Sequence, residues 1–107
     1  MIGFLANGKE QTGKKFDQEK LRMDLIPHTA YESLARALTY GSMKYGDNNW
    51  QDIELHRYVG ALMRHFVEFL KDVNSIDEES GLRHAECMLV NAMFINHLAP
   101  FVNDQKE

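Results

Sequence analysis

The sequence has few of the residues that would define several classes of protein. Among its 107 residues there is one cysteine, Cys87, which excludes an internal disulfide framework and fits a reducing compartment. There are 12 basic residues against 16 acidic ones, which argues against a binder of duplex nucleic acid, whose surface should be basic. No apolar run approaches the length of a membrane span, and the first residues do not resemble a leader peptide. We therefore expect a cytoplasmic protein that binds neither duplex nucleic acid nor a membrane.

What the sequence does contain is apolar residues at helical spacing. Hydrophobic residues make up 44% of the chain and charged residues 26%, which is typical of a globular domain. The first predicted helix opens after Pro27 with a capping box, Thr29 to Glu32, and ends at Gly46. The second is capped by Asp52.

The third predicted helix runs from residue 81 to residue 98, because Pro100 ends it. Strand-period alternation is absent, so the predicted fold class is all-α, a small helical bundle. We expect a single domain over residues 1–107, with an irregular N-terminal arm over residues 1–20 and a frayed tail over residues 101–107.

The spacing of apolar residues also predicts which helix faces are buried. On the second helix the apolar stripe is Leu55, Val59, Leu62, Met63, Phe66, Phe69, Leu70 and Val73. On the third helix it is Leu82, Ala85, Met88, Leu89, Ala92, Ile95 and Leu98, with His84, Cys87 and Asn91 on the opposite, polar face. The stripe on the second helix is too wide for one partner helix to cover, so we expect a homo-oligomer, at least a dimer.

Polar residues that could carry chemistry gather between the second and third helices. Three carboxylates follow one another at residues 77–79, near His65 and His84. Such a cluster can hold Mg²⁺ or Mn²⁺ through oxygen ligands, and nearby Lys and Arg side chains can then neutralise phosphates. The ordinary alternative is a solvated first turn of the third helix beside a hydrogen-bonded histidine.

Four segments in a fixed order resemble a known family. They are residues 16–27 (FDQEKLRMDLIP), 38–50 (LTYGSMKYGDNNW), 57–65 (RYVGALMRH) and 77–84 (DEESGLRH), the last followed by Asn91 and Phe94. They are similar to the first segment and to the LTYGAxKYGxxNW, RYxxALxRH and DxESGLxH patterns of phage-encoded dATP/dGTP diphosphohydrolases. That family is related to the MazG-like all-α nucleotide pyrophosphohydrolases, and the resemblance spans about residues 15–97.

The resemblance implies metal-dependent hydrolysis of a purine deoxynucleoside triphosphate at a phosphoanhydride bond, in the cytoplasm of a phage-infected host. In such a reaction a divalent metal lowers the pKa of water and withdraws charge from the leaving group. By position, Asp77 and Glu79 would hold Mg²⁺ or Mn²⁺, and His65 and His84 would lie beside them as ligands or proton carriers.

The resemblance also implies a nucleotide-binding set. Lys44 and Arg64 would clamp phosphates, and Lys20 and Arg22 would reach in from the arm. Trp50 and Asn49 would contact the base, and Asn91 the sugar or the base.

The sequence departs from the family pattern at one position that matters for the metal. The family carries a Gly-Glu pair before DxESG, where this chain has Val73 and Asn74. An amide is a weaker Mg²⁺ ligand than a carboxylate. Cys87 also stands where the family pattern has a histidine. Either Glu68, Asp72 or Glu78 substitutes, or catalysis is impaired and the chain is a nucleotide-binding protein. The latter could sequester a host immune signalling nucleotide as an anti-defence protein.

Overall fold

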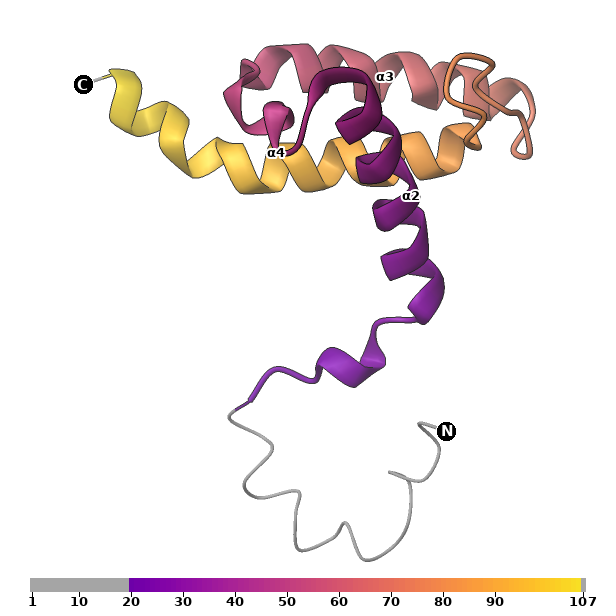
Figure 1. The fold of residues 1–107 in the computed structure, drawn as a ribbon, viewed down its shortest axis with the longest axis horizontal. Helices are drawn as coiled ribbons and strands as arrows, with labels where there is room; N and C mark the ends of the chain where they lie inside the picture. The colour runs from indigo at the N-terminus through magenta and orange to yellow at the C-terminus, as the bar shows by residue number, and fades with distance from the viewer. Residues whose placement is uncertain (1–19, 107) are drawn as a thin grey trace, which may run out of the picture. The chain divides into compact units, whose positions relative to one another are not determined.

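The structure is a computed structural model that describes residues 20–106 (Figure 1). The chain divides into two units, Met1–Ala30 and Tyr31–Glu107. All regular elements among the described residues are helical, apart from one isolated antiparallel bridge between Ile76 and Arg83. The predicted all-α fold class is therefore confirmed.

The described residues of the first unit begin at Lys20, so nearly all of the predicted N-terminal arm, residues 1–20, lies outside them. The described part contains one short 3₁₀ turn, η2 (Met23–Leu25). The guanidinium of Arg22 donates two hydrogen bonds to Asp24, from Nε to Oδ1 at 2.8 Å and from Nη2 to Oδ2 at 2.7 Å. This two-point pairing is the strong form of an arginine–carboxylate contact.

The helix α2 (His28–Tyr45) begins earlier than the capping box predicts. The carbonyl of Pro27 accepts a hydrogen bond from the N–H of Ala30 at 3.0 Å, so Thr29 lies inside the helix and is not its cap. The fixed φ of proline suits a helix start, which explains the earlier beginning. The C-terminus follows the prediction: Gly46 has a φ of 99°, which a glycine adopts without strain.

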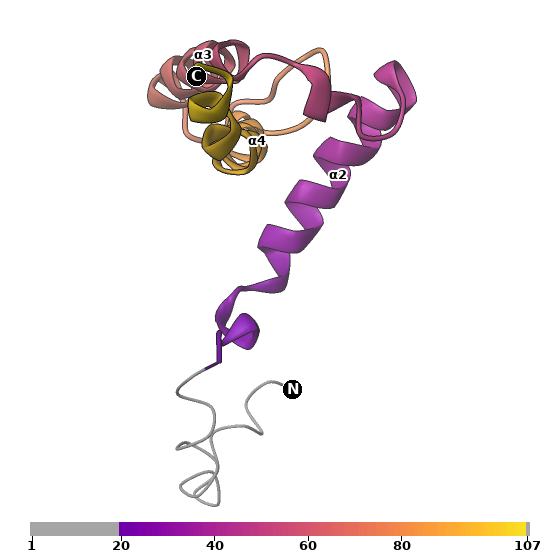
Figure 2. The ribbon, with the colours of Figure 1, turned by 90° about the vertical axis from the view of Figure 1, so that its left-hand side faces the viewer.

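The helices α3 (Leu55–Lys71) and α4 (His84–Lys106) lie side by side and run antiparallel (Figure 1), as the end-on view also shows (Figure 2). A short 3₁₀ turn, η3 (Asn49–Asp52), precedes α3 and contacts α4. The predicted cap of α3 was wrong, because Asp52 belongs to η3 and Glu54 occupies the N-cap with extended backbone.

The predicted end of the third helix was also wrong. The helix α4 continues through Pro100 to Lys106, where a frayed tail was expected. A proline inside a helix removes one N–H donor and leaves the carbonyl four residues earlier without its partner. That carbonyl belongs to Asn96, an exposed residue, so water can satisfy it and the helix can continue.

By length and composition alone, the segment His84–Val102 of α4 could cross a membrane, and it is the one described helix that could. The core helix of a bundle has the same composition, and α4 packs along α3. The absence of a membrane partner therefore stays a prediction, as does the cytoplasmic location.

The interior of the second unit is more polar than the apolar stripes predict. Within the described residues, Cys87 and Val90 are the buried apolar side chains, whereas four polar ones are buried: Ser33, His84, Glu86 and Asn91. His84, Cys87 and Asn91, which were expected on the outer face of the third helix, thus face inward. The predicted buried face of that helix is wrong in part, because Leu89 and Ala92 are exposed.

In a single chain the apolar stripe of α3 is exposed to solvent. Met63 is 62% exposed, Phe66 45% and Leu70 64%, and Val59 and Val67 are also exposed. Positions 59, 63, 66 and 70 are three or four residues apart, which is the spacing of a seam between two helices. The expected self-association stays a prediction, and this face is where it would occur.

We predict that Met63→Glu weakens this self-association. A charge at the centre of an apolar seam should raise the dissociation constant by about tenfold or more, which corresponds to ~1.4 kcal/mol. Sedimentation velocity over a range of micromolar concentrations measures the change. The matched control is Met43→Glu, at a methionine of α2 that is 82% exposed and outside the seam. A parent chain that is monomeric throughout this range, or equal effects of the two substitutions, would contradict the prediction.

Candidate functional site

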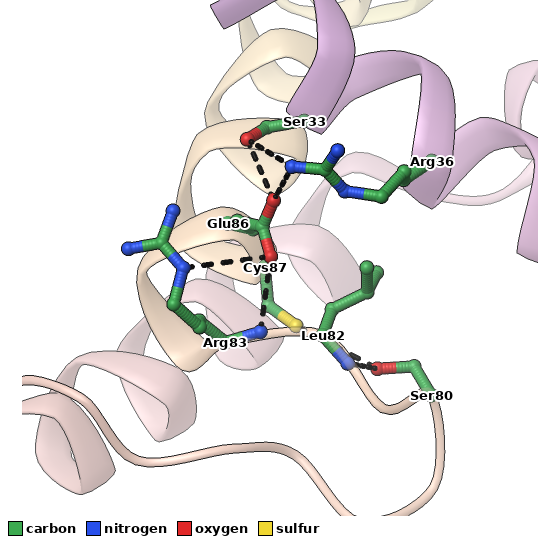
Figure 3. A network of polar contacts seen from close by, with 7 residues as sticks. All are labelled: Ser33, Arg36, Ser80, Leu82, Arg83, Glu86 and Cys87. Carbon is green, nitrogen blue, oxygen red and sulfur yellow. Dashed lines mark hydrogen bonds and ion pairs between the residues drawn. The ribbon is translucent and has the colours of Figure 1, made fainter. Parts of the chain in front are cut away.

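A buried carboxylate connects α2 to α4. Glu86 lies in the first turn of α4, and its Oε2 accepts hydrogen bonds from Ser33 Oγ at 2.7 Å and from Arg36 Nη2 at 2.5 Å, both on α2 (Figure 3). Its Oε1 accepts the backbone N–H of Arg83 at 3.1 Å. Burial raises the pKa of a carboxyl group, but these hydrogen bonds outweigh it and lower the pKa of Glu86 to about 2. The ionised Glu86 therefore holds α2, with Lys44 near its end, in place beside α4.

The connection between α3 and α4 is fixed by its own hydrogen bonds. The N–H of Asp77 donates to the carbonyl of Leu82 at 2.7 Å, and the N–H of Gly81 donates to the carbonyl of Asp77 at 2.7 Å. Gly81 has a φ of 78°, a conformation that favours glycine. At the end of the connection, the N–H of His84 donates to the carbonyl of Ser75 at 3.0 Å. These bonds set the positions of Asp77 and His84 relative to each other.

Three ionisable side chains converge at this end of the helix pair. His65 from α3 and His84 from α4 approach to 2.8 Å between their Nδ1 atoms, so that one ring nitrogen donates and the other accepts. One oxygen of Asp77 and one nitrogen of each histidine all lie within 4.8 Å of one another. We call these three residues the His65–Asp77–His84 cluster.

The surroundings of the cluster shift its pKa values. Burial lowers the pKa of His65, and this effect outweighs the attraction of Asp77. Burial alone would raise the pKa of Asp77, but hydrogen bonds from the Oγ and N–H of Ser80 lower it. The cluster therefore contains an ionised carboxylate beside a histidine that favours its neutral form.

A cavity of about 830 Å³ opens within the second unit. It is lined from α2, η3, α3, the connection and α4. Lining residues include Tyr40, Lys44, Asn49, Trp50, Tyr58, His65, Asp77, Glu79, Asn91 and Phe94. The structure thus brings together seven of the residues that the sequence singled out: Lys44, Asn49, Trp50, His65, Asp77, Glu79 and Asn91. His84 joins them through its contact with His65.

One end of the cavity is aromatic. The ring of Trp50 stacks on Phe94 with centroids 4.8 Å apart, and Tyr58 lies 4.5 Å from the same Phe94 ring. The hydroxyl of Tyr58 donates to the carbonyl of Trp50 at 2.8 Å, and burial raises the pKa of Tyr58 to about 12. Close by, the amide Nδ2 of Asn91 donates to the carbonyl of Cys87 at 2.7 Å, which leaves Oδ1 as an acceptor.

The aromatic end and the cluster are separated along the same two helices. Tyr58 and His65 are seven residues apart on α3, and Phe94 and His84 are ten apart on α4. At 1.5 Å of rise per residue these separations are about 10 Å and about 15 Å. Because the helices are antiparallel, the ring pair Tyr58 and Phe94 and the histidine pair His65 and His84 lie at two different levels along them. The cavity is therefore a groove with aromatic rings at one end and ionisable groups at the other.

Lys44 is already engaged in this structure. Its ammonium forms an ion pair with Glu79, which raises the pKa of Lys44, and it lies over the rings of Tyr40 and Tyr45. Glu79 is therefore bonded to Lys44, whereas Asp77 lies with the two histidines. The predicted pairing of Asp77 with Glu79 as ligands of one metal stays a prediction.

The remaining predicted residues lie elsewhere. Arg64 is exposed and is not among the residues lining the cavity. Lys20 and Arg22 belong to the first unit, so their predicted reach toward phosphates stays a prediction. Asn74, at the position of the expected glutamate, is exposed just after α3, and its backbone N–H donates to Asp72.

Several contributing residues were missed in the sequence. Tyr58 and Phe94 belong to the similar motifs, but aromatic residues at helical spacing are also typical of an ordinary core. Ser80 orients Asp77 through local hydrogen bonds that no motif predicts. Glu86 anchors α2 through Ser33, which is distant in the sequence. Their roles depend on the tertiary structure.

Comparison with known proteins gives one family and one close relative. A family profile described as "dATP/dGTP diphosphohydrolase, N-terminal" matches residues 10–106. A protein of Salmonella phage PMBT28, named dATP/dGTP diphosphohydrolase, is 43% identical over 84 residues. The match covers 78% of this chain but 29% of the relative, so this chain corresponds to less than a third of that protein. No solved structure matches the chain.

We predict that Glu86→Gln destabilises the fold by about 1–3 kcal/mol, because it weakens charge-assisted hydrogen bonds in a buried position. The matched control is Glu54→Gln, since the side chain of Glu54 is 72% exposed while that of Glu86 is 6% exposed. This control should change stability by no more than about 0.5 kcal/mol. Urea unfolding at one fixed chain concentration measures both. Equal losses in the two variants would show that the network does not hold the fold.

Proposed function

This chain belongs to the dATP/dGTP diphosphohydrolase, N-terminal, family, and we propose that it binds a purine deoxynucleoside triphosphate and takes part in hydrolysing a phosphoanhydride bond of that nucleotide. The observation that carries the proposal is the groove with an aromatic end and an ionisable end about 10–15 Å apart. An extended nucleotide has the same polarity, with an aromatic base at one end and phosphates at the other.

The aromatic end suits a purine base. Base-on-aromatic stacking is favourable for every base, and Trp50, Tyr58 and Phe94 offer ring faces or edges there. The free acceptor Oδ1 of Asn91 suits an exocyclic amino group or a sugar hydroxyl. Asn91 is buried, so its bond to Cys87 fixes the direction of that acceptor before the nucleotide arrives.

The phosphates would lie toward Lys44 and the cluster. A triphosphate carries more charge than one carboxylate, so it can displace Glu79 from the ammonium of Lys44. The existing ion pair is largely exposed, with Lys44 37% and Glu79 65% exposed, and exposed pairs contribute at most about 1 kcal/mol. Displacement therefore costs little, and it frees the carboxylate of Glu79 close to the phosphates.

Hydrolysis needs a water molecule that loses a proton and a leaving phosphate whose charge is screened. We infer that a divalent cation, Mg²⁺ or Mn²⁺, held at Asp77 supplies the screening. His65 lines the cavity and lies beside Asp77 in a form that favours neutrality, so its ring nitrogen can either bind the cation or accept a proton there. Ser80 orients the carboxylate of Asp77 through two hydrogen bonds.

A second function is favoured by one observation. Asn74 replaces the carboxylate expected ahead of Asp77, and Glu79 is bonded to Lys44, so a single carboxylate belongs to the cluster. A groove that binds a nucleotide without cleaving it would sequester that nucleotide, as an anti-defence protein sequesters a host immune signal.

One experiment separates the two functions. The full chain is incubated with dATP, dGTP, dCTP and dTTP, each with Mg²⁺ or Mn²⁺, and the products are resolved by chromatography. We expect new products from dATP and dGTP, and their loss in Asp77→Asn. Unchanged nucleotide that stays bound to the protein in excess EDTA would instead favour sequestration. No product and no retention would refute hydrolysis of these four nucleotides and their sequestration.

We predict that Lys44→Gln weakens nucleotide binding by about tenfold to a hundredfold, because one charged hydrogen bond contributes roughly 1.5–3 kcal/mol. The matched control is Lys71→Gln. Lys71 also ends a helix and also pairs with a glutamate, Glu68 at 3.0 Å, but it does not line the cavity. Isothermal titration calorimetry measures both affinities. The assignment of Lys44 to the phosphates fails if the two variants bind the nucleotide equally well.

A further inference from the structure

The His65–Asp77–His84 cluster has donor atoms of two kinds. Two are imidazole nitrogens that face each other at 2.8 Å between Nδ1 atoms, with ring centroids 5.0 Å apart. The third is a carboxylate oxygen, and the three donor atoms lie within 4.8 Å of one another. They come from α3, from the connection and from the first residue of α4. Three separate segments therefore bring one potential ligand atom each to within 4.8 Å of the others.

The spacing fits a small divalent cation. Metal–nitrogen bonds of about 2.1 Å place neighbouring ligand atoms about 3.0 Å apart at a right angle and about 3.4 Å apart in a tetrahedron. The two Nδ1 atoms, at 2.8 Å, need to separate by only a few tenths of an ångström to reach these values. In the absence of an ion, one of these two nitrogens must carry a proton that the other accepts, and a metal would replace that proton.

The cluster is held in place without any ion. The Oδ2 of Asp77 accepts hydrogen bonds from the N–H of Ser80 at 3.0 Å and from its Oγ at 2.7 Å, so Oδ1 keeps its capacity as a ligand. The backbone N–H of Asp77 donates to the carbonyl of Leu82 at 2.7 Å, and the N–H of His84 donates to the carbonyl of Ser75 at 3.0 Å. Such outer hydrogen bonds orient metal ligands and are costly to lose.

We propose that His65, Asp77 and His84 bind one divalent cation of the first-row transition series, from Mn²⁺ to Zn²⁺, in preference to Mg²⁺. Imidazole nitrogen suits these ions, whereas Mg²⁺ is bound through oxygen. Two neutral imidazoles and one carboxylate leave a bound divalent ion with one net positive charge. Three protein ligands also leave open positions that face a cavity lined by His65 and Asp77.

The family resemblance implied Asp77 and Glu79 as the metal pair, with His65 and His84 beside them as ligands or proton carriers, whereas the proposal assigns the metal to Asp77 and both histidines. In the structure Glu79 is bonded to Lys44, and two histidines take the places beside Asp77. The proposal concerns metal binding alone, so it holds whether or not the chain hydrolyses a nucleotide.

The full chain is first freed of metal with a chelator, and the chelator is removed. It is then titrated separately with Zn²⁺, Co²⁺, Mn²⁺ and Mg²⁺. We expect calorimetry to show one Zn²⁺ or Co²⁺ per chain, bound at least a hundredfold more tightly than Mg²⁺. The visible absorption band of Co²⁺ should also shift and strengthen relative to the aqueous ion, which reports a change of ligands independently of any activity.

Two variants assign the ligands. Asp77→Asn preserves the size of the side chain, and His65→Gln alters a half-buried position, so both should fold. We expect each to weaken Co²⁺ binding by at least tenfold and to lose the Zn²⁺-dependent rise in unfolding temperature. The control is His56→Gln, at an exposed histidine of α3 whose side chain is 77% exposed, and it should bind Co²⁺ as the parent does.

The outcomes are distinct. No binding of Zn²⁺ or Co²⁺, binding of Mg²⁺ as tight as theirs, or equal weakening in His56→Gln would each overturn the proposal. Zinc or cobalt binding by a chain that leaves all nucleotides unchanged would support the proposal and count against hydrolysis. Hydrolysis with Mg²⁺ that survives in both cluster variants would count against the metal site and leave hydrolysis standing.

Discussion

The ionised carboxylate of Glu86 is the interaction on which the rest of the site depends. It is buried on α4 and is bonded to Ser33 and Arg36 of α2 and to the backbone of Arg83. Through these bonds it ties α2, which carries Lys44 near its C-terminus, to the start of α4. A buried charge is stable only with several donors, and here the donors come from the two helices that must be joined.

This polar interior reverses the usual arrangement of an amphipathic helix. The face of α4 that carries His84, Cys87 and Asn91 is turned inward toward the cavity, while the apolar seam of α3 faces outward. In a single chain these polar side chains line the interior, and the apolar seam of α3 remains exposed. The same constraint explains why so few apolar side chains in the described residues are fully buried.

The sequence was informative where structure depends on local chemistry. Gly46 ends α2 as predicted, because a positive φ after a helix is a local requirement. Pro100 did not end α4. The carbonyl that loses its N–H partner is exposed, so water can bind to it at little cost in free energy. The inward face of α4 could not be predicted either, because apolar periodicity does not distinguish the interior of one chain from the interface between two.

The site, too, could be predicted from the sequence only in part. Lys44, Trp50, His65 and Asp77 come from separate motifs on α2, η3, α3 and the connection before α4, and all four line the cavity. The partner of Glu79 could not be predicted from spacing, since three neighbouring carboxylates look alike in sequence. The turn around Gly81 separates them: Asp77 accepts from Ser80 and lies with the histidines, whereas Glu79 reaches Lys44. In the proposed site, the hydrogen bonds of this short connection leave one carboxylate beside the two histidines, which would favour ions that prefer nitrogen ligands.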